Sequence, residues 1–355
     1  MKILHTADLH LGSVMTSRLS SEKARERGVE LFTSFERLAG NAVLHGARLF
    51  IIAGDLFDTQ KLSTRNIDRV IDVIAGHPHI DFLYLPGNHE KNALSESGRA
   101  LPDNLKIFGK EWTYFEYDDV VIAGKSEISA NMFTELKVNE AKKNVLVLHG
   151  AVADRCGADN VGLREARGLG IDYIALGHYH SYDTFEVDDR CTAVYSGTPE
   201  GRGFDECGEK GYVIIDTERG RVTHEFHKSA KRTVHIKNVD ISYLSKSLEV
   251  QDAVAKVLYE IPSSDLVRVV ISGRRAQDLF PDRDGIASKY RDKFYYFEVK
   301  DESKTAIDMD AFKYDKSLKG EFMRLCLADT ELSDEDREEV IRAGISALLN
   351  IDIEI

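Results

Sequence analysis

The sequence has few of the features that mark a secreted, membrane-bound or disordered protein. Its four cysteines, at positions 156, 191, 207 and 326, include no C-x-x-C pair, so we expect free thiols rather than a disulfide framework or a thiolate metal site. Only 6 prolines occur in 355 residues, and no Ser/Gly-rich stretch suggests a long linker. No run reaches the roughly 18 apolar residues that a membrane helix needs. We therefore expect a soluble cytoplasmic protein that does not bind a membrane.

The chain also lacks an excess of basic residues. It carries 47 Lys and Arg against 60 Asp and Glu, which gives a formal net charge of −13. Because contacts to nucleic-acid phosphates depend on Lys and Arg, this balance argues weakly against a DNA-binding protein. It leaves the class open, because the local field decides binding and bound metal ions add positive charge.

Strand-like and helix-like segments alternate over roughly the first 225 residues, a pattern that favours a layered α/β domain. Apolar, β-branched runs predict buried strands, and one amphipathic helix is expected from about Ser20 to Gly46, with a second over 65–75. The strands that matter most for the site are expected at 2–4, 49–53, 82–85, 145–148 and 173–176.

The chain is too long for one ordinary domain, and its pattern changes near residue 231. We expect an α/β domain over 1–230, a small α+β domain over 231–310 and a helical segment over 311–355. That segment should contain helices at 318–327 and 334–349, the second opening with a capping-box-like Ser333-x-x-Asp336. It is too short to form a core alone, so it packs either on its own domain or on a partner.

Polar motifs follow each of the five strands named above. They are Asp8-x-His10, Gly54-Asp55-x-x-Asp58, Gly87-Asn88-His89-Glu90, His149-Gly150 and Gly177-His178-x-His180. Side chains at the C-terminal ends of strands in an α/β fold converge on one place. Carboxylate, amide and imidazole ligands without sulfur suit a pair of Mn, Fe, Mg or Zn ions. The motifs therefore predict a two-metal phosphoesterase.

Each ligand type has a part to play in such a site. Two ions need a shared carboxylate, and Asp55 is the best bridge because it ends a central strand and follows a glycine. Asp8 and His10 can reach one ion together, and the neutral amide of Asn88 would leave the other ion Lewis-acidic. The set is completed by His149, His178 and His180. About four ligands per ion leave room for a hydroxide that attacks phosphorus in line.

Two further residues have predicted roles beside the ligands. His89 directly follows Asn88 and is our candidate for the general acid to the leaving alkoxide, because histidine titrates near pH 6.5. Asp58 either holds a ligand histidine in its working tautomer or caps the following turn. A lone D-x-H or G-D is usually structural, but all five motifs in this order and at strand ends argue for a site.

Together these motifs resemble the calcineurin-like metallophosphoesterase superfamily, and in detail the SbcD/Mre-eleven family of DNA-repair nucleases. The segments 3–12, 53–58, 195–200 and 204–212 carry the closer likeness. The resemblance implies a four-layer α/β/β/α nuclease sandwich, then a small α+β capping domain and C-terminal helices. It also implies one ion on Asp8, His10, Asp55 and His180, a second on Asp55, Asn88, His149 and His178, and His89 as the catalytic histidine.

The resemblance further implies manganese as the preferred ion, DNA as the substrate and a cytoplasmic, nucleoid-associated location. A homodimer would form through residues 62–76 and 92–101, and an SbcC-type, Rad-fifty-like coiled-coil ATPase would bind a C-terminal helix such as 334–349. The expected activity is exonuclease, with 3′→5′ polarity, and endonuclease in double-strand-break repair. Basic residues available for DNA are scattered through loops: Lys61, Arg65, Lys91, Arg99, Arg155 and Arg202.

Two other functions are consistent with the same residues. A phosphodiesterase or phosphatase for a small substrate would use the same metals under a closed cap. A scaffold that binds DNA ends without chemistry would have no need of His89 beside seven intact ligands, which argues against it.

Overall fold

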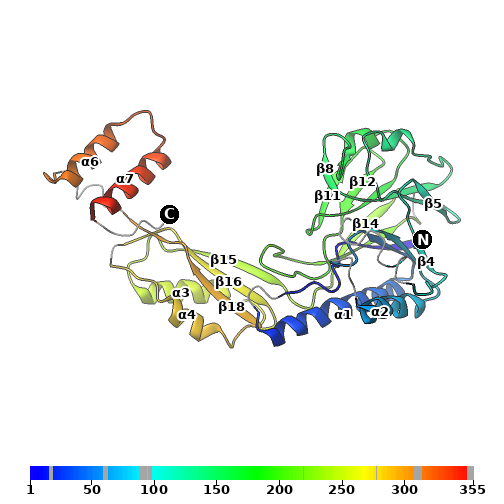
Figure 1. Cartoon of the computed structure of the whole chain (residues 1–355), viewed down its shortest axis with the longest axis horizontal. Coiled ribbons are helices and arrows are strands. Elements are labelled where there is room, and N and C mark those ends of the chain that lie inside the picture. The colour runs from blue at the N-terminus through cyan, green and yellow to red at the C-terminus, as the bar shows by residue number, and fades with distance from the viewer. Residues whose placement is uncertain are drawn as a thin grey trace. The chain divides into compact units, whose positions relative to one another are not determined.

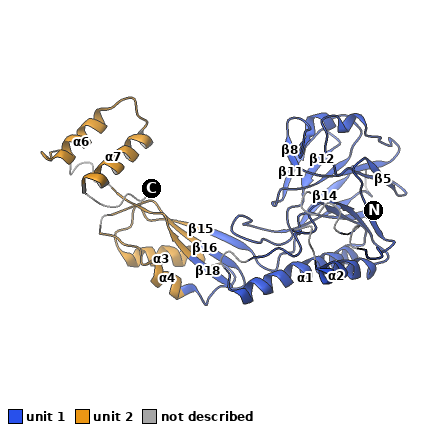
Figure 2. Cartoon of the chain, in the orientation of Figure 1, with its two compact units in different colours: residues 1–236, 261–268, 290–298 blue, residues 237–260, 269–289, 299–355 orange. Residues whose placement is uncertain are grey.

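The computed structural model describes residues 1–15, 19–58, 63–87, 94, 98–218, 220–276, 278–306 and 314–349 (Figure 1). Internal contacts divide the chain into two units, coloured separately in Figure 2. Unit 1 comprises residues 1–236, 261–268 and 290–298, and unit 2 comprises 237–260, 269–289 and 299–355. The division at residues 230 and 310 that the sequence suggests stays a prediction.

Unit 1 is built on two six-stranded sheets. The first has the order β14-β13-β1-β2-β3-β4. Its strands are β1 (Lys2–Thr6), β2 (Ala47–Ala53), β3 (Asp81–Leu85), β4 (Leu105–Ile107), β13 (Gly211–Asp216) and β14 (Thr223–Lys228). The strands predicted over 2–4, 49–53 and 82–85 lie side by side in its centre, and β13 and β14 pair antiparallel at one edge.

The second sheet has the order β11-β12-β10-β7-β6-β5. Its strands are β5 (Thr113–Glu116), β6 (Val120–Gly124), β7 (Lys143–His149), β10 (Tyr173–Gly177), β11 (Asp183–Glu186) and β12 (Thr192–Tyr195). A separate short pair, β8 (Ala151–Ala153) and β9 (Asn160–Gly162), follows β7. The predicted strands at 145–148 and 173–176 are therefore neighbours, but in a different sheet from the other three.

Parallel pairing aligns the ends of the strands that carry the motifs. In the first sheet Thr6 pairs with Ile52 and Ala53 pairs with Leu85, and in the second Gly177 pairs with His149. Because these strands are parallel within each sheet, their C-terminal ends meet at one edge, which is where the fold places the polar residues that follow them.

The two sheets face each other across an apolar core. Ile3, Ile51 and Leu83 from the first sheet pack in one buried cluster with Val147 and Ala175 from the second. This cluster fixes the two sheets against each other, which matters because each sheet supplies part of the site.

Helices α1 (Ser21–His45) and α2 (Thr64–Ala75) cover the other face of the first sheet (Figure 1). Phe35 and Leu38 of α1 are buried against Phe50 and Phe82 of the sheet. The Ser20 side chain caps α1, and Gly46 ends it with φ 68°, as the sequence predicts. The outer face of the second sheet packs against loops and the 3₁₀ helices η2 (Met132–Thr134) and η3 (Leu163–Ala166). The predicted α/β fold with two stacked sheets is confirmed.

Three further strands have residues in both units: β15 (Val234–Asp240), β16 (Leu266–Ser272) and β18 (Tyr296–Asp301). The three strands form one sheet in the order β15-β16-β18. The other elements are α3 (Ser247–Leu258), α4 (Arg283–Tyr290), the short pair β17 (Arg274–Arg275) and β19 (Lys304–Thr305), and helices α6 (Leu318–Ala328) and α7 (Asp334–Leu349).

Helices α6 and α7 pack on each other through a small core of their own. Met323 and Cys326 of α6 are buried with Ile341 and Ile345 of α7. The predicted capping interaction at the start of α7 is present, since Asp336 N–H donates to Ser333 Oγ at 3.1 Å. Among the described residues, no helix is both long enough and apolar enough to cross a membrane.

Candidate metal centre

The segments that follow β1 and β2 run side by side beyond the first sheet. Asp8 N–H donates to Gly54 O at 3.1 Å, and His10 N–H donates to Asp55 O at 2.9 Å. These backbone bonds continue the strand pairing by a few residues and bring the side chains of Asp8, His10 and Asp55 to one place.

Four predicted ligands have a strained backbone. Asp8, His10, Asp55 and His178 have φ of 52°, 45°, 49° and 106°. Among the other described residues, Asp159 is the one non-glycine with a positive φ. Such conformations cost of order 1–3 kcal/mol each and persist where the surrounding structure enforces them, commonly at functional sites. Their concentration here points to a site whose geometry is maintained at the expense of stability.

Two glycines of the motifs give the side chains room to approach the backbone. A Cβ on Gly54, which has φ 92°, would lie 2.0 Å from His149 Nδ1. A Cβ on Gly87 would lie 2.0 Å from Asp55 Oδ1. Both positions therefore require glycine, because any side chain would displace a predicted ligand.

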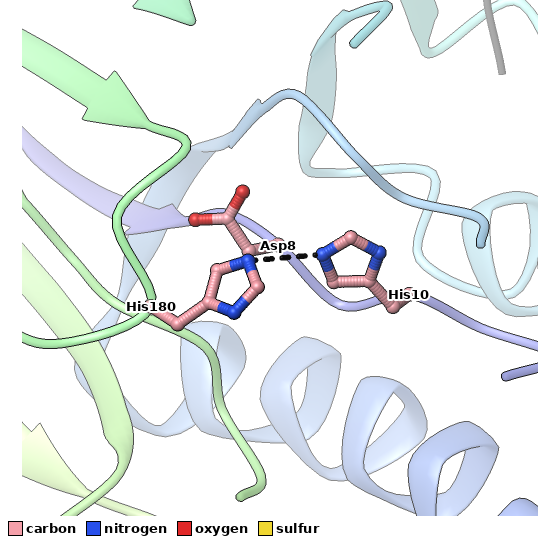
Figure 3. A group of neighbouring side chains, drawn as sticks. All are labelled: Asp8, His10 and His180. Atoms are coloured by element: carbon pink, nitrogen blue, oxygen red, sulfur yellow. Dashed lines mark hydrogen bonds between the residues drawn. The ribbon is translucent and has the colours of Figure 1, made fainter. Parts of the chain in front are cut away.

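The first group of possible ligands consists of Asp8, His10 and His180, whose ligand atoms lie within 4.8 Å of one another (Figure 3). The two imidazoles face each other, with His10 Nε2 and His180 Nε2 3.2 Å apart. His180 Nδ1 lies 2.8 Å from Glu206 Oε1, and His10 Nδ1 lies 3.3 Å from Asp58 Oδ1.

Glu206 contacts the Nδ1 atom of His180, so Nε2 is the ring nitrogen of His180 that faces His10. Two imidazole nitrogens that converge beside the carboxylate of Asp8 are a typical ligand set for a divalent ion. The first group therefore fits a metal ion.

The second group consists of Asp8, Asp55 and His149, all three buried. His149 Nδ1 donates to Ala53 O at 3.0 Å, which directs the Nε2 atom toward Asp55 Oδ2, 3.5 Å away. That Nε2 is buried and has no hydrogen-bond partner among the described residues. A buried imidazole nitrogen directed at a carboxylate fits a cation between them, either a proton on the ring or a metal ion.

The two groups are joined by carboxylates. Asp8 belongs to both, and Asp55 Oδ2 lies 3.9 Å from His10 Nε2 as well as 3.5 Å from His149 Nε2. Both Asp8 oxygens accept from the His178 N–H, at 3.0 and 3.1 Å. The His178 ring packs edge-on against His149, with ring centres 5.5 Å apart.

The electrostatics of the site also favour a bound cation. Burial raises the pKa of the Asp8 carboxyl to about 6, although His149 and His180 oppose this. Burial lowers the pKa of His149, but Asp55 and Asp8 outweigh it and raise that pKa to about 9. The buried carboxylates thus draw a proton onto His149, and a divalent ion would satisfy the same demand for positive charge.

Of the predicted site residues, the structure gathers Asp8, His10, Asp55, His149 and His180, with His178 alongside. Asn88 and His89 lie outside the described residues. Asp58 Oδ1 lies 3.3 Å from His10 Nδ1, and both roles considered for Asp58, holding that histidine or capping a turn, stay predictions.

Sequence reasoning assigned no role to Glu206, which forms a second layer of the site. Glu206 is 2% exposed and accepts from His180 Nδ1, from the Arg202 backbone N–H at 2.7 Å and from Arg202 Nε at 2.9 Å. Burial raises the pKa of Glu206, but His180 and Arg202 outweigh it and hold that pKa well below its ordinary value. Glu206 is therefore a permanent carboxylate that orients His180.

Arg202, considered above for DNA contact, is instead engaged within the protein. Its side chain is 17% exposed, and its Nη1 lies 3.1 Å from Asp58 Oδ1. It thereby bridges Asp58 and Glu206, the two carboxylates that lie beside the histidines of the first group. No spacing in the sequence indicates this pairing, because Asp58 and Arg202 are 144 residues apart.

A family model for calcineurin-like phosphoesterases matches residues 1–182, slightly more than half of the chain. The chain belongs to this family, and the match contains all five strand-end motifs.

Individual relatives support the narrower likeness inferred from the motifs. A DNA double-strand break repair protein Mre11 from Methanosarcina acetivorans is 28% identical over 297 residues, covering 77% of this chain and 46% of that protein. A protein of the same name from Saccharolobus solfataricus is 26% identical over 238 residues, covering 60% of each. A component of the nuclease SbcCD from Staphylococcus epidermidis is 24% identical over 266 residues, covering 63% of this chain and 68% of that protein. The chain thus spans 46% and 60% of the length of the first two relatives.

Proposed function

We propose that this protein is a two-metal phosphodiesterase that cleaves DNA, acting as exonuclease and endonuclease in double-strand-break repair. The observation that carries the proposal is the pair of ligand groups that share Asp8, with His10 Nε2 and His180 Nε2 3.2 Å apart and His149 Nε2 directed at Asp55. The names of the relatives supply the substrate class.

In this proposal the first ion is held by Asp8, His10, Asp55 and His180. The second is held by Asp55, Asn88, His149 and His178. Two divalent ions, with Mn²⁺ as the preferred metal, would lower the pKa of a water molecule and neutralise charge on the phosphoryl oxygens.

The chain's own residues would position those ions and move one proton. Glu206 holds His180 with its Nε2 atom toward the site, and Asp58 lies beside His10 Nδ1. His89 donates a proton to the leaving alkoxide, a contribution of typically 10²–10⁴-fold for general acid catalysis.

The finer parts of the proposal concern polarity and partners. We propose 3′→5′ exonuclease polarity, a homodimer formed through residues 62–76 and 92–101, and an SbcC-type ATPase as partner. Helices α6 and α7 support a partner site, because beyond their shared core they expose Leu325, at 65%, and Val340, at 41%. The location that follows is the cytoplasm, at the nucleoid.

The test is cleavage of an end-labelled DNA duplex with Mn²⁺, with Mg²⁺ and with chelator, alongside hydrolysis of bis-p-nitrophenyl phosphate. Wild-type protein should shorten the duplex with Mn²⁺, and Asp55→Asn should abolish both reactions. Asp252→Asn makes the same change on the exposed surface of α3 and should alter neither. Hydrolysis of the small ester while the duplex stays intact would refute the nuclease proposal in favour of a small-substrate phosphodiesterase.

A further inference from the structure

A hollow of about 400 Å³ lies beside the metal centre within unit 1. Its size falls in the range of small-molecule sites, roughly 300–1,000 Å³. It is lined by the segment 202–205, by Met15 and Leu19, and by the first residues of β16 and β18.

Arg202 connects this hollow to the metal centre. The same side chain that lines the hollow contacts Asp58 and Glu206 and has its Nη2 3.4 Å from His180 Nδ1. A molecule in the hollow is thus separated from the histidines of the first ligand group by one guanidinium.

Two aromatic rings line the hollow. The rings of Phe204 and Tyr296 have centres 6.0 Å apart and planes at 53°, and the Arg268 guanidinium lies 3.9 Å from the centre of the Phe204 ring. The apolar side chains of Met15 and Leu266 line the same hollow and are 8% and 3% exposed. Flat apolar walls with a cation at one side are suited to a planar ring with polar edges.

The charges of the hollow disfavour a second phosphate. Arg202 is paired with Asp58 and Glu206, and Arg268 forms an ion pair with Glu298. Because both cations already have carboxylate partners, the hollow carries little uncompensated positive charge and suits a neutral ligand.

We propose that this hollow binds the nucleobase next to the phosphodiester bond that is hydrolysed. The inference rests on the proposed nuclease function and adds the part of the substrate that is recognised. Phe204 and Tyr296 stack on the base, and Arg268 lies against the stacked rings. Because every base has a π-face, this site would position the strand without selecting a sequence.

The test removes an aromatic ring from the protein and, separately, one base from the DNA. Single-stranded oligonucleotides, identical except for one abasic residue, are cut with Mn²⁺ by wild-type protein, by Phe204→Leu and by Tyr296→Leu. Base–aromatic stacking corresponds to about a 5- to 150-fold change. Wild-type protein should cut the bonds next to the abasic residue at least about 5-fold more slowly than the same bonds with a base present. The two variants should lose a similar factor on the intact strand and little more on the abasic one.

Phe280→Leu is a matched control, because Phe280 also has an arginine over its ring, Arg275 at 5.0 Å, but does not line the hollow. It should cut like wild type. Equal losses by Phe204→Leu on intact and abasic strands would mean that the ring only supports the fold, and would overturn the proposal. So would a wild-type protein that cuts both strands equally.

A binding measurement separates this inference from the nuclease proposal. Calorimetric titration with thymidine 5′-monophosphate and with deoxyribose 5-phosphate, both with Mn²⁺, needs no cleavage. Tighter binding of the nucleotide that disappears in Phe204→Leu would support the base site even if no DNA were cut. Equal binding of the two ligands by wild-type protein would overturn it.

Discussion

Replacement of Glu206 by glutamine tests whether the second layer of the site holds the first ion in place. Glutamine keeps the size of the side chain but removes the charge that orients the His180 Nδ1 proton. Loss of such an outer-shell partner typically lowers metal affinity 10–100-fold, which corresponds to about 1.4–2.7 kcal/mol of binding free energy. We expect this loss at the ion held by His10 and His180, with the ion near His149 little affected.

The same change should also lower the free energy of unfolding. Removal of one partner from a buried ion pair costs about 3–5 kcal/mol. Arg202 keeps Asp58 at 3.1 Å, so we expect a smaller cost of about 2 kcal/mol. Glu209→Gln is the control, because Glu209 pairs with Lys228 with both side chains more than half exposed, and such surface pairs contribute about 0–1 kcal/mol.

The assay is calorimetric titration with Mn²⁺, paired with urea unfolding of the metal-free protein. Wild type should bind two Mn²⁺ ions. In Glu206→Gln one ion should keep its affinity, and the other should bind 10–100-fold more weakly. A variant that loses about 2 kcal/mol of stability but binds both ions as wild type would refute the orienting role and leave Glu206 a purely structural residue.

Three further predictions concern charge, metal and chemistry. Burial raises the pKa of Glu30, but Arg232 and Lys231 outweigh it and hold that pKa at about 2. A carboxyl group whose pKa is lower in the folded protein than in the unfolded chain stabilises the fold at pH values above the unfolded pKa, and this stabilisation is lost as the pH falls through the folded pKa. In urea unfolding, the free energies of unfolding of wild type and Glu30→Gln should therefore converge as the pH is lowered from about 5 to about 2. Chelation of a metal-loaded sample should lower its thermal midpoint, since a ligand at 100 times its Kd contributes about 2.7 kcal/mol, and Asp8→Asn should show a much smaller shift. His89→Ser should keep both ions by metal analysis yet lose at least about 10²-fold in hydrolysis of bis-p-nitrophenyl phosphate, and unchanged turnover would exclude His89 from the mechanism.

Much of the fold could be predicted because its elements are locally encoded. The apolar stripe of α1, its Ser20 cap and the glycine at its end each follow from neighbouring residues. The central strands are short β-branched runs between turns. Strands such as β4 and β11 were not predicted, because their residues are half exposed or exposed and lack the apolar pattern of a buried strand.

Candidate ligands could be found for a similar reason, since parallel strands carry the residues that follow them to a common edge. The spacing of the motifs did not reveal that the candidate ligands come from two sheets. Asp8 and Asp55 follow strands of the first sheet, and His149 and His180 come from the second. It also gave no sign that Asp8 belongs to both ligand groups. Tertiary pairing decides these points, and no local spacing encodes it.

The charged residues behind the site, Asp58, Arg202 and Glu206, depend on the position of one sheet relative to the other. His10 follows a strand of the first sheet and lies beside Asp58, while His180 follows a strand of the second and is held by Glu206. Arg202 ties these two carboxylates together. A small shift of one sheet against the other would therefore separate the two Nε2 atoms and also break the bridge behind them. The apolar core between the sheets thus serves the chemistry as well as stability, because it fixes the distance across which the two histidines face each other.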